Sequence, residues 1–174
     1  MMKKMSLLAA MVLFASLAVA HEGELGTQAN PITLADLSVQ ETIHNDDDPF
    51  KGTFTLIVQN TSDTAWTDFH FGIFTAQGEG DASNVFFADD VLTMVGYNAV
   101  HTIDSHVISP EGDTLDLYFD SNPVQPGELV GFTVFTDNTA DKVNFGICFY
   151  PTVPEPASLA LLGLGGLALI RRKK

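Results

Sequence analysis

The chain has 174 residues, with 22 acidic residues against eight lysines and arginines, and a formal net charge of −14 at pH 7. The basic residues gather at the two ends, so residues 21–153 contain Lys51 and Lys142 against 21 acidic residues, a formal charge of −19. Such a surface repels phosphate groups, which excludes nucleic-acid binding through basic contacts and disfavours anionic membranes.

Residues 1–20 have the pattern of a secretory signal peptide. Lys3 and Lys4 precede an apolar run over residues 7–19, and Ala18 and Ala20 supply the small residues that signal peptidase requires. We expect cleavage after Ala20 and export of a chain that begins at His21.

The middle of the chain predicts β-strands, because hydrophobic and polar residues alternate in short runs separated by turn-forming clusters. We expect an all-β fold, a single antiparallel β-sandwich or jelly-roll-like domain of eight or nine strands over residues 21–153, with residues 21–31 as a loose arm. The signal peptide and a short C-terminal hydrophobic helix would flank it. The expected strands are 32–42, 53–59, 68–73, 85–88, 91–95, 100–108, 114–120, 130–135 and 143–150.

Residues 137–141, Asp-Asn-Thr-Ala-Asp, lie between two alternating runs. Short polar loops of this kind join paired antiparallel strands, so we expect a hairpin here.

Two single residues invite a functional interpretation, but packing explains both. Cys148 is the one cysteine and lies in an expected strand without an activating base nearby, so we expect a buried structural thiol. Trp66 is the one tryptophan and begins a strand, on the face opposite Phe69 and Phe71. We expect Trp66 to pack in the core or at the edge of the sandwich rather than to bind sugar.

Acidic clusters are the candidates for a metal site. Asp46, Asp47 and Asp48 share one loop, while Glu79 with Asp81 and the pair 89–90 lie in others. Calcium takes six to eight oxygen ligands, and loops of extracellular sandwiches often supply them. Adjacent carboxylates are equally common in ordinary solvated turns. Asp46, Asp47 and Asp48 are therefore the best calcium candidates, and we expect no other metal and no cofactor.

A mature N-terminal His21 on a β-sandwich resembles the copper-binding arrangement of lytic polysaccharide monooxygenases. That arrangement needs a second histidine near the first. His101 and His106 are five residues apart in an expected strand and would face opposite sides. No argument from the sequence brings either of these, or His44 or His70, next to His21, so we expect no copper site.

The sequence has no Gly-x-Ser-x-Gly, His-Glu-x-x-His or phosphate-binding loop. We therefore expect no catalytic residues, and a structural or interaction domain. The alternative is a secreted carbohydrate-binding module or carbohydrate-active enzyme, because carboxylates are plentiful enough for a glycosidase pair.

The C-terminal 21 residues have three parts. Pro154, Glu155 and Pro156 come first, residues 157–170 carry no charge, and Arg171, Arg172 and two lysines end the chain. As a helix, residues 157–170 would reach about 21 Å, short of a hydrocarbon core of about 30 Å. The order of these parts closely resembles the PEP-CTERM sorting signal of bacterial envelope proteins.

The resemblance implies an address and no activity. It implies that an exosortase-like membrane protease recognises Pro154, Glu155 and Pro156, with Arg171 and Arg172 in the basic end. Residues 157–170 would anchor the chain transiently in the inner membrane of a bacterium with an outer membrane. The domain would then reach the cell surface or extracellular matrix, where extracellular polysaccharide is a candidate partner.

Overall fold

The computed structural model describes residues 24–45, 51–139 and 144–153. The expected signal peptide with its cleavage site, the expected C-terminal helix and His21 lie outside these residues. Within them there are ten strands and no helix long and apolar enough to cross a membrane. The strands are β1 (Glu24–Leu25), β2 (Ile32–Leu34), β3 (Gln40–Asn45), β4 (Lys51–Asn60), β5 (Asp68–Phe74), β6 (Val85–Gly96), β7 (Ser105–Ile108), β8 (Thr114–Tyr118), β9 (Leu129–Asn138) and β10 (Asn144–Thr152).

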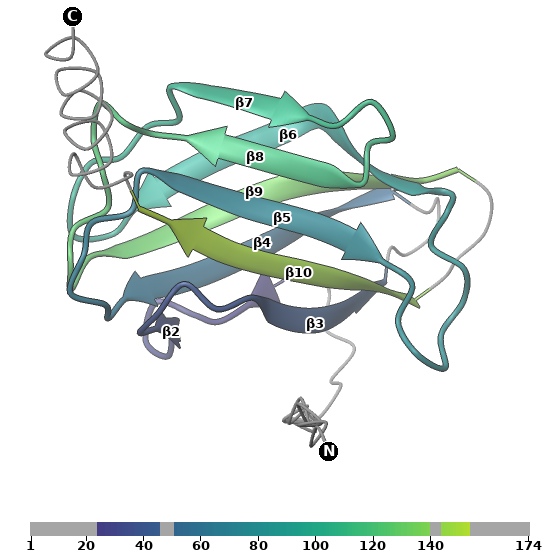
Figure 1. The fold of residues 1–174 in the computed structure, drawn as a ribbon, viewed down its shortest axis with the longest axis horizontal. Coiled ribbons are helices and arrows are strands. Elements are labelled where there is room, and N and C mark those ends of the chain that lie inside the picture. The colour runs from purple at the N-terminus through teal and green to yellow at the C-terminus, as the bar shows by residue number, and fades with distance from the viewer. Residues whose placement is uncertain (1–23, 46–50, 140–143, 154–174) are drawn as a thin grey trace, which may run out of the picture.

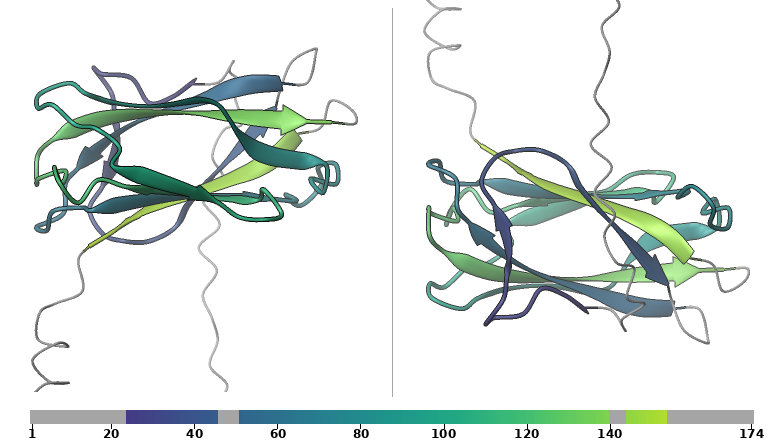
Figure 2. Two further views of the ribbon diagram at one scale, coloured as in Figure 1. Left: turned by 90° about the horizontal axis from the view of Figure 1, so that it is seen from above. Right: turned by 90° about the horizontal axis from the view of Figure 1, so that it is seen from below.

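The strands form two sheets packed face to face (Figures 1 and 2). Sheet A has the order β1-β4-β9-β6, and β2 also pairs with β4; sheet B has the order β3-β10-β5-β8-β7 and lies in front in Figure 1. The expected all-β fold is confirmed. The strands number ten rather than eight or nine, and β1 and β2 run parallel to β4, so the sandwich is not entirely antiparallel.

The alternating hydrophobic residues form the core between the sheets, as the period of two requires. On β5 of sheet B, Phe69 is fully buried and stacks on Phe132 of β9 in sheet A, with 4.5 Å between ring centroids. Trp66 is also fully buried, 6.1 Å from the Phe69 ring. Large apolar side chains from both sheets therefore share one core. The other inward residues include Phe54, Leu56, Val58, Phe71, Leu115, Leu117, Phe119, Val130, Val134, Phe145, Ile147 and Phe149.

Four of the nine expected strands are wrong. The run 32–42 is divided between β2 in sheet A and β3 in sheet B, and the runs 85–88 and 91–95 form the single strand β6 with a bulge between Ala88 and Leu92. The run 100–108 is a strand only over Ser105–Ile108. Alternation reports which side chains face inward, but a chain that bulges or passes from one sheet to the other can keep the same pattern.

The expected hairpin at residues 137–141 is also wrong. Strand β9 pairs with β4 and β6, whereas β10 pairs with β3 and β5, so the two strands lie in different sheets. Asp137 and Asn138 belong to β9 itself, and residues 140–143 lie outside the described part. A short polar connection between alternating runs fits a passage between sheets as well as a hairpin.

Part of the expected loose arm belongs to the sandwich. Glu24 and Leu25 pair with Thr55 and Leu56 of β4, and Leu25 packs against the core. The polar composition of this segment did not reveal β1, because a strand of two residues carries almost no alternating signal.

Candidate functional site

Five side chains on the outer face of sheet B form the candidate site, which we call the Tyr–His platform: Asp68 and His70 of β5, Asp116 and Tyr118 of β8, and Tyr150 of β10. Each alternates with buried core residues and so faces outward. Strand β5 lies between β10 and β8, which places His70 directly opposite both Tyr150 and Asp116, and Asp68 opposite Tyr118.

His70 is the central side chain of the platform and contacts three of the other four. Its ring stacks on Tyr150, with 4.8 Å between centroids and 25° between planes. Its Nδ1 lies 2.6 Å from Asp116 Oδ1, and its Nε2 lies 3.8 Å from Asp68 Oδ2. Thr152 Oγ1 hydrogen-bonds to Asp68 Oδ1. The imidazole is thus positioned between two carboxylates and one aromatic ring.

The two tyrosines remain neutral phenols at physiological pH. Desolvation raises the pKa of Tyr118, and the charges of Asp116 and Asp68 raise it further. Desolvation likewise raises the pKa of Tyr150, with Asp116 contributing next. A neutral tyrosine offers an apolar ring face together with a hydroxyl group that donates and accepts hydrogen bonds.

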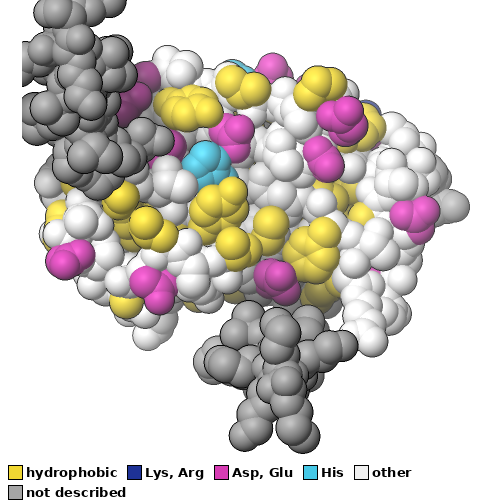
Figure 3. All heavy atoms as spheres, viewed as in Figure 1, with side chains coloured by type: hydrophobic (Ala, Val, Ile, Leu, Met, Phe, Trp, Pro, Cys, Tyr) yellow, Lys and Arg dark blue, Asp and Glu magenta, His cyan; other side chains and the backbone are white. Residues whose placement is uncertain are grey.

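Apolar side chains extend the platform along sheet B. Ile43 of β3 is 36% exposed and Val107 of β7 is 53% exposed. The Phe74 ring lies over Gly146, where an added Cβ would approach ring atoms to 2.2 Å. Figure 3 shows hydrophobic side chains running across this face, with acidic groups beside them.

The outer face of sheet A differs from this. A row of threonines, Thr55, Thr133 and Thr93, crosses its middle, and the first two share a hydrogen bond of 3.1 Å. Tyr97 also lies over Gly131 on this face, and Val95 is 51% exposed, but the described strands of sheet A contain no histidine. What distinguishes sheet B is the combination of an aromatic ring, an imidazole and two carboxylates at one place, and we take this face as the candidate site.

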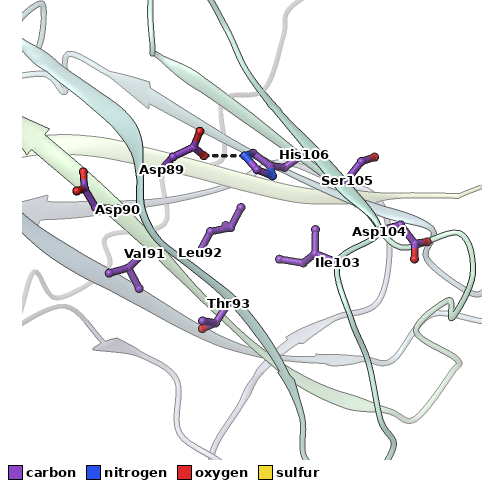
Figure 4. Close-up of a pocket in the computed structure, with 9 residues that line it drawn as sticks. All are labelled: Asp89, Asp90, Val91, Leu92, Thr93, Ile103, Asp104, Ser105 and His106. Atoms are coloured by element: carbon purple, nitrogen blue, oxygen red, sulfur yellow. Dashed lines mark hydrogen bonds and ion pairs between the residues drawn. The ribbon is translucent and has the colours of Figure 1, made fainter.

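A groove between the edges of the two sheets is the second candidate (Figure 4). A hollow of about 540 Å³ lies beside the bulge in β6 and is lined by residues of β6, of β7 and of the segment just before β7. His106 Nε2 lies 2.6 Å from Asp89 Oδ1 across it. Asp104 points away and bonds to Ser121, which lowers the pKa of its carboxyl group.

The carboxylates of the groove do not converge, because Asp90 also points away from Asp89 in Figure 4. Among the residues that the structure describes, no three His, Cys, Asp or Glu side chains form a group that could hold a metal ion. The calcium candidates Asp46, Asp47 and Asp48 lie outside these residues.

Cys148 is half-buried on the outer face of sheet B rather than buried in the core as expected. Its strand pairing places it opposite Glu41 and Gly72. Burial raises the pKa of the thiol, and the negative charge of Glu41 raises it further. The prediction of burial failed because the residues that face the core are Phe145, Ile147 and Phe149, one position out of step with Cys148.

Trp66 packs in the core, as predicted, but it contacts Phe69 instead of facing the opposite side. It lies before β5 and bridges to Val124, so strand alternation does not apply to it. A fully buried indole is unavailable to a ligand.

The histidines have separate environments. His44 is buried, edge-on to Phe54 and Phe145. His101 is buried in the loop before β7, with Nε2 3.2 Å from Glu128 Oε2, while His106 lies in β7. His101 and His106 therefore do not share one strand, contrary to expectation.

Alternation alone could have identified the outward tyrosines, histidine and aspartates, since they occupy the polar positions of their strands. What it could not show is that the three strands are neighbours.

No curated protein matches the chain significantly. A family model described as the PEP-CTERM protein-sorting motif matches residues 152–174. The match begins at the last residue of β10 and covers the whole C-terminal tail. The tail predicted from Pro154, Glu155 and Pro156 is therefore a PEP-CTERM sorting motif. This motif implies export, processing by an exosortase at the membrane and surface localisation.

Proposed function

We propose that residues 21–153 form a non-catalytic interaction module, displayed at the cell surface or in the extracellular matrix after exosortase processing. The observation that carries this proposal is the Tyr–His platform. Aromatic rings, a histidine and carboxylates lie together on an open sheet face, where a large partner has access.

The groove supports a non-catalytic role. Asp89 is paired with His106, Asp104 is bonded to Ser121, and Asp90 points elsewhere. Glycosidases require two carboxyl groups that face one bond of the substrate. The groove lining contains no aromatic ring besides the imidazole of His106, so it offers little surface for sugar stacking.

The alternative is a secreted carbohydrate-active enzyme that uses the platform carboxylates. Release of reducing ends from polysaccharides by the purified domain distinguishes the two. We expect none, whereas turnover that disappears in Asp116→Asn would establish the enzyme. A carbohydrate-binding module, the other alternative, is itself a non-catalytic interaction domain and is compatible with the proposal.

For sorting, we propose that the exosortase recognises Pro154, Glu155 and Pro156 and cuts near them, while the basic end with Arg171 and Arg172 remains on the cytoplasmic side. Thr152 ends β10 and pairs with Asp68 of β5. A cut after residue 153 would therefore release the sandwich with the central strands of sheet B intact.

Mass spectrometry of the exported protein tests the sorting proposal. We expect the mature form to begin at His21 and to lack Arg171 and the residues that follow. Replacing Pro154, Glu155 and Pro156 by Ala should leave an uncut, membrane-bound precursor. The matched control replaces Pro110 and Glu111, the same residue types in an exposed loop, and should be processed normally. An intact basic end on the exported wild type would instead indicate a simple tail anchor.

A further inference from the structure

We propose that the Tyr–His platform binds an uncharged polysaccharide chain, which deepens the interaction-module function proposed above and rests on it. Sugar rings present weakly polar C–H faces and a periphery of hydroxyl groups. A protein surface that binds them needs aromatic faces for the first and hydrogen-bonding groups for the second.

Contacts within the protein position the central part of the aromatic surface. The Tyr150 ring is stacked on His70, which Asp116 holds at 2.6 Å, and Tyr118 lies beside Asp68 on the neighbouring strand. Side chains fixed in this way lose little conformational freedom when a ligand settles on them. The rings are also mounted on the central strands of a sheet, which hold a binding surface more precisely than loops do.

The hydrogen-bonding groups lie within the same surface. Asp116 has a side chain 33% exposed, and Asp68 has a side chain 19% exposed. Carboxylates accept strong hydrogen bonds from hydroxyl groups, and the tyrosine hydroxyls can donate. The row Tyr150–His70–Asp116 crosses three adjacent strands, about 10 Å at the usual strand spacing. A polymer that crosses the strands would meet ring faces and acceptors in succession.

The charges of sheet B select among polymers. Its five strands contain no Lys or Arg, while Asp68, Asp116 and Glu41 face outward. Uronate, sulfate or phosphate groups would face these carboxylates without a counter-charge, which is unfavourable. A neutral, hydroxyl-rich chain avoids this repulsion and matches the aromatic rings and the acceptors.

The same charges disfavour a second copy of this chain as the occupant. A two-fold symmetric dimer through this face would bring the same surface of each copy together, with the carboxylates of one facing those of the other. We therefore do not expect the protein to dimerise through this face.

Affinity electrophoresis in native gels tests the proposal, because the acidic domain migrates rapidly and retardation by a neutral polymer is easy to measure. The probes are dextran, galactomannan, laminarin and mixed-linkage β-glucan, with alginate as the polyanion. We expect at least one neutral polymer to retard the domain and alginate to have no effect. Tyr150→Ala should raise the dissociation constant about tenfold or more.

Tyr97→Ala is the matched control, since Tyr97 is 36% exposed and lies over Gly131 of sheet A. It should bind like the wild type. Thermal melting verifies folding of each variant, and if Tyr150→Ala is unfolded the conservative Asp116→Asn decides, with an expected loss of several-fold in affinity.

Three results would overturn the proposal: no retardation by any neutral polymer, an equal loss in Tyr97→Ala, or a dimer in size-exclusion chromatography that Tyr150→Ala dissociates. Any of these in a protein that is still exported and cut at its tail would leave the sorting part of the proposed function standing.

Discussion

At the scale of single residues, Asn60 shows how one buried polar side chain secures a loop. Its amide nitrogen donates to the carbonyl oxygens of Thr64 and Val124, both at 2.9 Å, and its Oδ1 accepts from the backbone N–H and hydroxyl of Ser62. The residue is fully buried. Although Asn60-Thr61-Ser62 matches a glycosylation sequon, this amide is inaccessible and serves to attach the loop before β5 to the end of β4.

Cys148 leads to a prediction about reactivity. Burial and the Glu41 carboxylate both disfavour the thiolate, so the raised pKa lowers the thiolate fraction at pH 8 below that of free cysteine. We expect slow alkylation by iodoacetamide, with a rate that keeps rising above pH 9. Glu41→Gln removes one cause and should speed the reaction at pH 8 about two- to fivefold.

The pH–rate profile separates acidity from access, since poor access lowers the rate at every pH without moving the profile. Glu24→Gln, on an exposed side chain of sheet A, is the control and should leave the rate unchanged. If Glu41→Gln reacts like the wild type, the carboxylate has no influence on Cys148.

At the scale of elements, the pairing of β1 and β2 with β4 depends on the turn that joins β1 to β2. Gly26 follows β1 with φ of 79°, and a Cβ added there would lie 2.5 Å from the Ile57 carbonyl oxygen of β4. Gly127 has a similar φ of 88°, but open space surrounds its Cβ position. The two glycines therefore separate the effect of backbone conformation from that of close contact.

We predict that Gly127→Ala lowers the free energy of unfolding by about 1–2 kcal/mol, the usual cost of a left-handed conformation. Gly26→Ala should lower the free energy of unfolding by about 1–3 kcal/mol more than this, because its Cβ also meets backbone atoms. Urea denaturation measures both. Equal losses would mean that β1 is not held against β4 as described.

At the scale of the whole molecule, charge is the dominant feature. Residues 21–153 carry a formal charge of −19, and their self-repulsion destabilises the compact state. Raising the salt concentration from about 0.01 M to 0.1 M shortens the screening length from about 30 Å to 10 Å. We predict that the melting temperature of the domain then rises by about 2–5 °C.

Calcium and magnesium at equal ionic strength distinguish screening from specific binding. We predict equal stabilisation, because screening depends on ion charge and concentration. A site at Asp46–Asp48 would add the mass-action term for calcium alone. A larger calcium effect that disappears in the double variant Asp47→Asn, Asp48→Asn would refute the prediction and establish the site.

The sequence by itself determined the β class, most of the core and the address of the protein. Strand alternation is a local property, so Phe54, Leu56 and Val58 could be assigned to the core without knowledge of their neighbours. The sorting motif is equally local, since it consists of Pro154, Glu155, Pro156 and the residues directly after them.

Only the tertiary structure decided which strands are neighbours, and with them the candidate site. His70, Asp116 and Tyr150 are far apart in the chain and meet because β5 lies between β8 and β10. The same pairing placed Cys148 on the outer face and separated β9 from β10. Strand pairing depends on contacts between distant segments, and a period of two contains no information about which segments these are.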